Sequence, residues 1–161
     1  MEARSNTGTG EISSFFEQDH REIDALFNGV LFESPQAALI AFKEFDRRLE
    51  RHIHWEEEIL FPAVSKKEPH LEMGPIGVMR MEHEEIRKNK AAALKALTEE
   101  NGAQAKNHAQ AMLNVLKEHN SKEEEILYPA CDQLLSVEET SDILRQIGSP
   151  AERSGPKPSA P

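Results

Sequence analysis

The chain of 161 residues lacks several features that would indicate particular classes of protein. It has one cysteine, Cys131, so an internal disulfide and a thiolate metal cluster are both excluded, and we expect this thiol to be buried and structural. The formal net charge is −10 and no basic cluster occurs, which argues against a nucleic-acid partner. No apolar run approaches the roughly 18 residues of a membrane helix, and residues 1–10 contain no hydrophobic signal region. These absences predict a cytoplasmic protein that binds neither nucleic acid nor membranes.

The sequence is also poor in β-branched runs and shows no alternation with period two. Its apolar residues recur at spacings of three and four, which is typical of amphipathic helices. Four long helices are predicted, at residues 11–28, 34–62, 75–101 and 103–129. The predicted fold is therefore all-α: an antiparallel up-down-up-down four-helix bundle, followed by a short fifth C-terminal helix.

Prolines, glycines and caps set the expected helix boundaries. Pro62 is expected to kink or end the second helix, because proline cannot donate its backbone hydrogen bond. The short fifth helix begins with the capping box Ser136-x-x-Glu139 and ends at Gly148. We expect a domain over residues 1–148 and a disordered tail over residues 149–161, where Pro, Ser, Gly and charged residues replace the helical periodicity.

An internal repeat is the most informative feature of the sequence. Residues 52–63 and residues 119–130 both follow the pattern H-x-x-x-E-E-E-I-L-[F/Y]-P-A. A shorter repeat reads D-H-x-E-I around His20 and E-H-E-E-I around His83. The chain thus resembles two helical hairpins, each of which supplies one histidine and then one His-x-x-x-Glu pair.

The spacing indicates where these side chains point. Residues four apart lie on one face of a helix, so His52 and Glu56 share a face, as do His119 and Glu123. Each pair lies on the apolar stripe of its helix, which on the fourth helix is expected to continue to Ile126. One histidine on such a stripe is usually a hydrogen-bonded core residue. Four histidines and two carboxylates on four helices indicate instead a buried metal site, because unpaired buried charges are costly.

The number and type of ligands restrict the metal. Imidazole and carboxylate donors suit Fe, Mn or Zn better than Ca or Mg. Six ligands are too many for one tetrahedral zinc ion. They suit two ions, each bound by two histidines, with both carboxylates shared. Open positions on a redox-active pair would allow the binding of O2, NO or peroxide.

Residues 11–130 resemble the hemerythrin-like family of HHE cation-binding domains, through the two His-x-x-x-Glu runs and the two shorter motifs. The resemblance implies a four-helix bundle with two iron ions as cofactor, in an oxo- or hydroxo-bridged di-iron centre. Carried over by position, the implied ligands are His20, His52, Glu56, His83, His119 and Glu123.

The chain departs from the oxygen-carrying hemerythrins at two places. Those proteins have an H-x-x-x-H pair on the third helix, whereas here Met79 and Arg87 lie four residues before and after His83. They also have an H-x-x-x-x-D pattern on the fourth helix, where this chain has His119-x-x-x-Glu123. The pattern is closer to bacterial hemerythrin-like proteins linked to nitric oxide, peroxide or iron–sulfur repair, and to iron-sensing domains. A ferritin-like centre is disfavoured, because its Glu-x-x-His motif occurs only once, at Glu17 to His20.

Three functions follow as hypotheses from these features. The first is a module that binds or senses O2, NO or iron, with a small diatomic ligand or peroxide as its partner. The second is a di-iron enzyme that handles peroxide or NO, or donates iron for iron–sulfur repair. The third is a structural metal bundle that acts in protein interaction. The sequence leaves the physiological ligand and the oligomeric state open.

The remaining candidates are expected to lie outside the metal site. His54 should face solvent and His108 the edge of the core, whereas His70 in a loop is a possible additional ligand. Trp55 and Tyr128 are expected to be packing aromatics. Four further glutamates are expected at the surface, although one of them could support a ligand from outside: Glu57, Glu58, Glu124 and Glu125.

Overall fold

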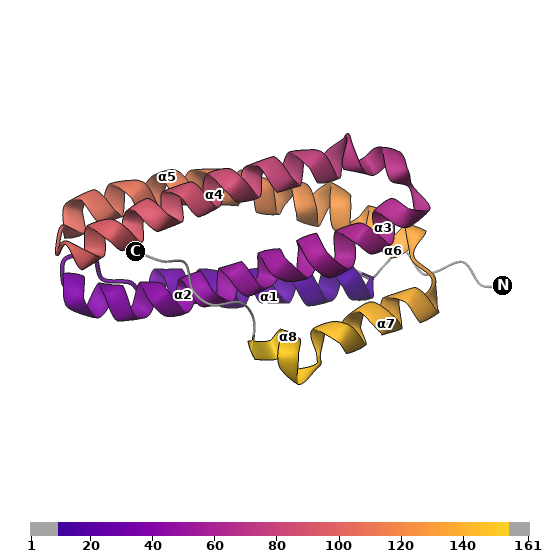
Figure 1. The fold of residues 1–161 in the computed structure, drawn as a ribbon, viewed down its shortest axis with the longest axis horizontal. Helices are drawn as coiled ribbons and strands as arrows, with labels where there is room; N and C mark the ends of the chain where they lie inside the picture. Colours follow the sequence, from indigo (N-terminus) through magenta and orange to yellow (C-terminus); the bar gives the residue numbers. More distant parts are fainter. Residues whose placement is uncertain (1–9, 155–161) are drawn as a thin grey trace.

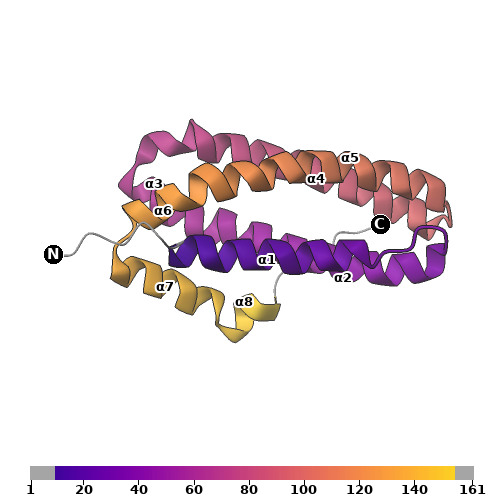
Figure 2. The same cartoon turned by 180° about the vertical axis from the view of Figure 1, so that it is seen from behind.

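The computed structural model describes residues 10–154 and contains only helices over that range (Figures 1 and 2), which confirms the all-α prediction. In chain order the elements are α1 (Glu11–Asn28), α2 (Pro35–Trp55), η1 (Glu56–Leu60), α3 (Phe61–Lys67), η2 (Pro69–Glu72), α4 (Pro75–Thr98), α5 (Gly102–Lys122), η3 (Glu123–Leu127), α6 (Tyr128–Leu134), α7 (Val137–Ile147) and α8 (Pro150–Ser154). No helix in the described part of the chain is long and apolar enough to cross a membrane.

The long helices form two hairpins that lie lengthwise against each other. In the first hairpin (α1 to α3) α1 packs beside α2, and in the second hairpin (α4 to α6) α4 packs beside α5. Contacts between α2 and α4 join the two hairpins. Figure 1 shows α7 and α8 running back along the outside of the first hairpin. The arrangement is consistent with the predicted up-down-up-down bundle.

The core consists of two apolar clusters. One lies toward the α1–α2 and α4–α5 connections and contains Ile23, Leu49, Ile86 and Leu116. The other lies toward α3, α6 and α7 and contains Phe16, Trp55, Met79 and Leu127. On each long helix the histidine of the repeat falls in sequence between a member of one cluster and a member of the other. The polar layer is therefore enclosed by apolar packing at both ends.

The prolines of the repeat do not end their helical runs, so of the two outcomes expected at Pro62, a kink or an end, the end does not occur. A proline within an α-helix clashes with the carbonyl four residues earlier. Here a five-residue π-helix, η1 or η3, leads into each proline-containing turn. The backbone N–H of Phe61 donates to the carbonyl of Glu56, and that of Tyr128 donates to the carbonyl of Glu123. The wider turn accommodates the proline ring, and the helices continue to Lys67 and Leu134.

The π-helix also changes which residues point inward. Ile126, expected on the buried stripe, is 62% exposed, whereas Leu127 is only 3% exposed. The extra residue per turn rotates the helix face relative to the regular α-helical phase that the periodicity assumed. As a result, Tyr128 follows Glu123 on the inner side of the bundle and is completely buried.

The connection between α4 and α5 is longer than predicted, because residues 99–101 lie between the two helices. The helix α4 ends at Thr98, and Glu100 has a positive φ of 56°. Asn101 caps α5, because its side chain accepts a hydrogen bond of 3.0 Å from the backbone N–H of Gln104. Gly102 is thus the first residue of α5 and not the stop of the preceding helix. A side chain could not fit there, because a Cβ atom would lie 2.1 Å from the carbonyl oxygen of Phe32.

The C-terminal region is more ordered than the composition indicated. The capping box of Ser136 and Glu139 is present at the start of α7, as predicted. Pro150–Ser154, within the range for which a disordered tail is predicted, form the short helix α8. Tertiary contacts hold this helix: Trp55 Nε1 donates to the carbonyl of Glu152 at 3.3 Å. Residues 155–161 of the predicted tail lie outside the described range.

Candidate metal centre

The six side chains predicted as metal ligands all lie in one buried layer. Each hairpin supplies three of them: His20 from α1, His52 from α2 and Glu56 from η1 in the first, and His83 from α4, His119 from α5 and Glu123 from η3 in the second. None of the six is more than 3% exposed. The i, i+4 spacing therefore placed each His and Glu pair on the inner face, as expected.

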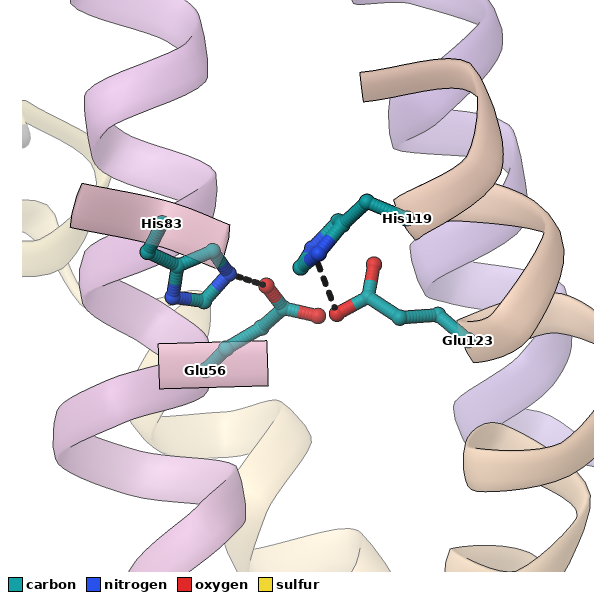
Figure 3. A group of neighbouring side chains, drawn as sticks. All are labelled: Glu56, His83, His119 and Glu123. Atoms are coloured by element: carbon teal, nitrogen blue, oxygen red, sulfur yellow. Dashed lines mark ion pairs between the residues drawn. The ribbon is translucent and has the colours of Figure 1, made fainter. Parts of the chain in front are cut away.

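Their donor atoms form two overlapping groups. Glu56, His83, His119 and Glu123 present ligand atoms that lie within 4.8 Å of one another. Figure 3 shows the carboxylates of Glu56 and Glu123 pointing toward each other between the two imidazoles. His20 and His52 form the second group together with Glu123. Glu123 is the member that both groups share.

Each imidazole is held from outside by a carboxylate on its Nδ1 atom. The four distances between Nδ1 and the carboxylate oxygen are 2.7 Å for His20 and Glu124, 2.8 Å for His52 and Asp19, 2.7 Å for His83 and Glu57, and 3.0 Å for His119 and Glu82. In a neutral ring this contact places the proton on Nδ1 and leaves the Nε2 lone pair free for a metal. All four Nε2 atoms indeed face the inner carboxylates, at 3.2 to 3.6 Å.

The outer carboxylates connect the hairpins in a regular way. Asp19 and Glu82, each the residue directly before a histidine of the short motif, bind the histidine of the adjacent helix in the same hairpin. Glu57 and Glu124, each the residue directly after an inner glutamate, bind a histidine of the opposite hairpin. The layer therefore has an approximate twofold pattern that follows the sequence repeat.

Sequence reasoning found these outer carboxylates only in part. Glu57 and Glu124 were expected at the surface, with one possible supporting role, whereas both contact an imidazole. Glu58 and Glu125 are exposed, as expected. No role was predicted for Asp19 or Glu82. Their signal in the sequence is the acidic residue that precedes the histidine in both short motifs.

Protonation of the centre reflects the excess of carboxylates. Burial alone would lower the pKa of His52, but Glu56 and Asp19 outweigh it and raise this pKa to about 10. For His83, burial is likewise outweighed by Glu56 and Glu57, which raise the pKa to about 9. Burial opposes ionisation of Glu123, yet the neighbouring His119 holds its pKa well below the usual range. The layer thus favours positive charge beside its carboxylates.

The donor set fits a metal ion on evidence from its own hydrogen bonds. Glu56 Oε1, Glu123 Oε2 and His83 Nε2 are buried, and none has a hydrogen-bond partner within residues 10–154. Buried polar atoms without partners are costly and uncommon. His83 Nε2 nevertheless lies 3.2 Å from Glu56 Oε1, so the two face each other as donors to a shared cation would. Imidazole and carboxylate donors are suited to Fe, Mn or Zn.

Tyr128 was expected to be a packing aromatic, but its hydroxyl belongs to the polar layer. It donates toward Glu56 Oε2 at 2.6 Å and Glu123 Oε1 at 2.9 Å. Burial and these two carboxylates raise the pKa of the phenol well above its usual value. The aromatic position of the repeat was visible in the sequence, but the regular helical phase does not place it beside Glu123.

The other histidines lie outside the layer. His70 is 74% exposed and pairs with Glu68 at 3.3 Å, so it does not join the six side chains. His54 is partly exposed and pairs with Glu152, and His108 lies at the edge of the core. Trp55 is buried within the apolar cluster toward α3, and Cys131 is buried, as predicted for both.

Comparison with known proteins agrees with the geometry. The model of the hemerythrin HHE cation binding domain matches residues 11–131, which include all six side chains of the layer and Tyr128. Searches of curated proteins and of solved structures found no match to the chain.

Proposed function

Because the chain belongs to the hemerythrin HHE cation-binding domain family, we propose that it holds a pair of iron ions between its helices and binds a small ligand there. The ligand is O2, NO or peroxide. The observation that carries the proposal is the orientation of the four imidazoles: Nδ1 of each is bound to an outer carboxylate, and Nε2 of each faces the inner carboxylates. This arrangement is typical of histidines that bind a metal.

The residues divide into two sets for the two ions. His20 and His52 would hold one ion, and His83 and His119 the other. Glu56 faces His52 and His83, Glu123 faces His20 and His119, and both carboxylates would be shared. Iron, once bound, supplies open coordination positions and a change of oxidation state.

The protein contributes orientation, charge and exclusion of water. The outer carboxylates fix each ring, and their negative charge stabilises a cation in the layer. The rings of Phe16 and His52 form a T-shaped pair with their centroids 5.3 Å apart, and Phe61 stacks on His83 with the centroids 6.1 Å apart. These rings and the two apolar clusters keep the centre away from bulk solvent, which strengthens its electrostatic interactions.

Reversible binding is favoured over catalytic turnover by the surroundings of the layer. Each imidazole is bound through Nδ1 to an outer carboxylate, and its Nε2 faces an inner carboxylate. No imidazole is therefore left as a separate proton shuttle. The up-down-up-down path of the helices would support such a rigid site, since it places all four ligand-bearing helices around one layer.

Metal analysis of the purified protein tests the proposal. We expect two iron ions per chain and a higher melting temperature with iron than after chelation; at a free iron concentration 100 times Kd the gain is about 2.7 kcal/mol. His119→Ala should lose iron, whereas His70→Ala, at an exposed histidine, should retain it. A protein that binds no iron and melts equally with and without it would refute the proposal. Peroxide turnover, in place of a reversible spectral change with O2 or NO, would favour the enzyme hypothesis.

A further inference from the structure

The two copies of the repeat differ at one position that faces the centre. The first copy has Phe61 where the second has Tyr128, and both side chains are fully buried. Each ring lies beside a histidine of the opposite hairpin. Phe61 stacks on His83 with an angle of 7° between the rings, and the ring centroids of Tyr128 and His20 are 5.7 Å apart. The repeat therefore presents a phenyl ring on one side of the layer and a phenol on the other.

The phenol oxygen lies among the donors of one ion. It is 2.6 Å from Glu56 Oε2 and 2.9 Å from Glu123 Oε1. It is also 3.3 Å from the Nε2 atoms of both His20 and His52. A phenol has a single proton and can donate only one hydrogen bond at a time. Four metal-ligand atoms around one hydroxyl are more than hydrogen bonding by that hydroxyl requires.

The π-helix η3 is what brings the hydroxyl to this place. In a regular α-helix of 3.6 residues per turn, a residue five positions after Glu123 would be rotated by about 140° away from it. The N–H of Tyr128 instead bonds to the carbonyl of Glu123, which closes a wider turn and aligns the two side chains. The same turn occurs before Phe61, so the backbone is equivalent and only the hydroxyl differs.

We propose that Tyr128 is a ligand of the ion held by His20 and His52, so that the two ions are inequivalent and the small ligand binds at the ion held by His83 and His119. The inference rests on the proposed function. Coordination replaces the O–H bond of the phenol by an oxygen–metal bond, and the proton leaves to solvent. The ion at His20 and His52 then has one more protein donor than its neighbour.

The surroundings of His83 agree with an open position on its side. Phe61 offers no donor atom there. Arg87, four residues after His83, is engaged by Glu50 at 2.6 Å and by Glu57 at 3.0 Å. Met79, four residues before His83, is buried in the apolar cluster toward α3. Neither flanking position therefore supplies a further imidazole or carboxylate to this ion.

The visible and resonance Raman spectra of the ferric protein test the assignment. Tyr128 is the single tyrosine of the chain, so any tyrosinate–iron signal must arise from it. We expect the wild-type protein to show a phenolate-to-iron charge-transfer band. Tyr128→Phe should lose this band and keep two iron ions, because the first copy of the repeat has phenylalanine at the same place. Phe61→Tyr is the matched variant and should keep the band and add a second tyrosinate signal.

The outcomes separate this inference from the proposed function. A wild-type protein with two iron ions and no tyrosinate signal would overturn the inference alone, whereas a protein without iron would overturn both. If Tyr128→Phe does not fold, ring-deuterated tyrosine in the wild-type protein provides the same test, since the Raman bands must shift. Azide titration locates the open position: we expect one azide per wild-type chain, and two would contradict the inequivalence of the ions.

Discussion

The first hairpin, residues 11–67, and the second hairpin, residues 75–134, present the same ligands to the centre but differ in what covers them. The helix α7 packs against η1 of the first hairpin. Ile59 in η1 is consequently only 8% exposed, whereas Ile126, its counterpart in η3, is 62% exposed. The repeat therefore determines the inner face of each hairpin, and the C-terminal segment makes the outer faces different.

The support of the outer carboxylates differs in the same way. Asp19 in the first hairpin is bound by Arg48 at 3.1 Å. Glu82, which has the corresponding role in the second hairpin, is paired with Lys122. Arginine holds a carboxylate through a planar, forked set of donors, whereas lysine acts as a point charge. Equal inner ligands are thus combined with unequal surroundings, and the two metal positions need not behave alike.

The largest expected effect comes from removing the inner glutamate that both groups of ligands share. Glu123→Ala should abolish binding of both ions, because Glu123 belongs to both groups. Glu56→Ala should cost less iron, because the contact of Glu56 with the first histidine pair is the longer one, 3.6 Å to His52 Nε2. Iron per chain measures both, and Glu125→Ala, at an exposed position, is the control. Equal loss in Glu56→Ala and Glu123→Ala would show that the two hairpins contribute equivalently.

Truncation of the paired isoleucines tests the different covering. Ile59→Ala should lower the free energy of unfolding by about 2–5 kcal/mol, the usual cost of a buried isoleucine. Ile126→Ala should change it by less than about 0.5 kcal/mol, because its side chain is mostly exposed. Urea unfolding of the two variants gives the comparison directly. Similar values for both would mean that α7 contributes little to the stability of the first hairpin.

Neutralising the outer carboxylates that join the hairpins should have a moderate effect. Glu57→Gln and Glu124→Gln keep the shape of the side chain but remove the charge beside His83 and His20. Each should weaken iron binding by roughly 10–100-fold, as measured by competition with a chelator. Glu58→Gln, adjacent and exposed, serves as the control. Wild-type affinity in both variants would limit these carboxylates to packing.

The smallest expected effect is a pH dependence that arises from His52 and His83. The pKa of His52 is raised to about 10 and that of His83 to about 9. In the metal-free protein their protonation therefore stabilises the fold fully below the unfolded value of 6.5, and this contribution disappears as the pH rises through 9 and 10.

Metal must displace those protons, so apparent iron affinity should increase with pH up to about 10. The melting temperatures of the metal-free and iron-loaded proteins should accordingly diverge as the pH rises. Iron loading at neutral pH should also release protons from the protein, which a weak buffer would detect. A constant difference between the two forms from pH 6.5 to 10 would contradict the raised pKa values.

Much of the centre could be predicted from local spacing. His52 and Glu56, or His119 and Glu123, meet on one helix face because i and i+4 positions are adjacent on any α-helix. Ser136 and Glu139 likewise form their capping box from local chemistry alone. The helical periodicity was sufficient to identify the all-α class, since an apolar stripe must be buried against another helix.

The errors arose where a regular helix was assumed or where the partner is distant in the chain. The π-helices before Pro62 and Pro129 changed the phase, which exposed Ile126 and brought Tyr128 to the centre. The helix α8 forms in a stretch without periodicity because Trp55 and Arg51 bind its carbonyls across the fold.

The amino-acid order alone was thus enough for the ligands and their pairing on each helix, because these depend on neighbours within one turn. Folding of the whole chain was needed to join Asp19 to His52, Glu124 to His20 and α7 to η1. Those contacts depend on how helices far apart in sequence pack, and a repeat that is nearly identical in both hairpins carries no information about which copy will be covered.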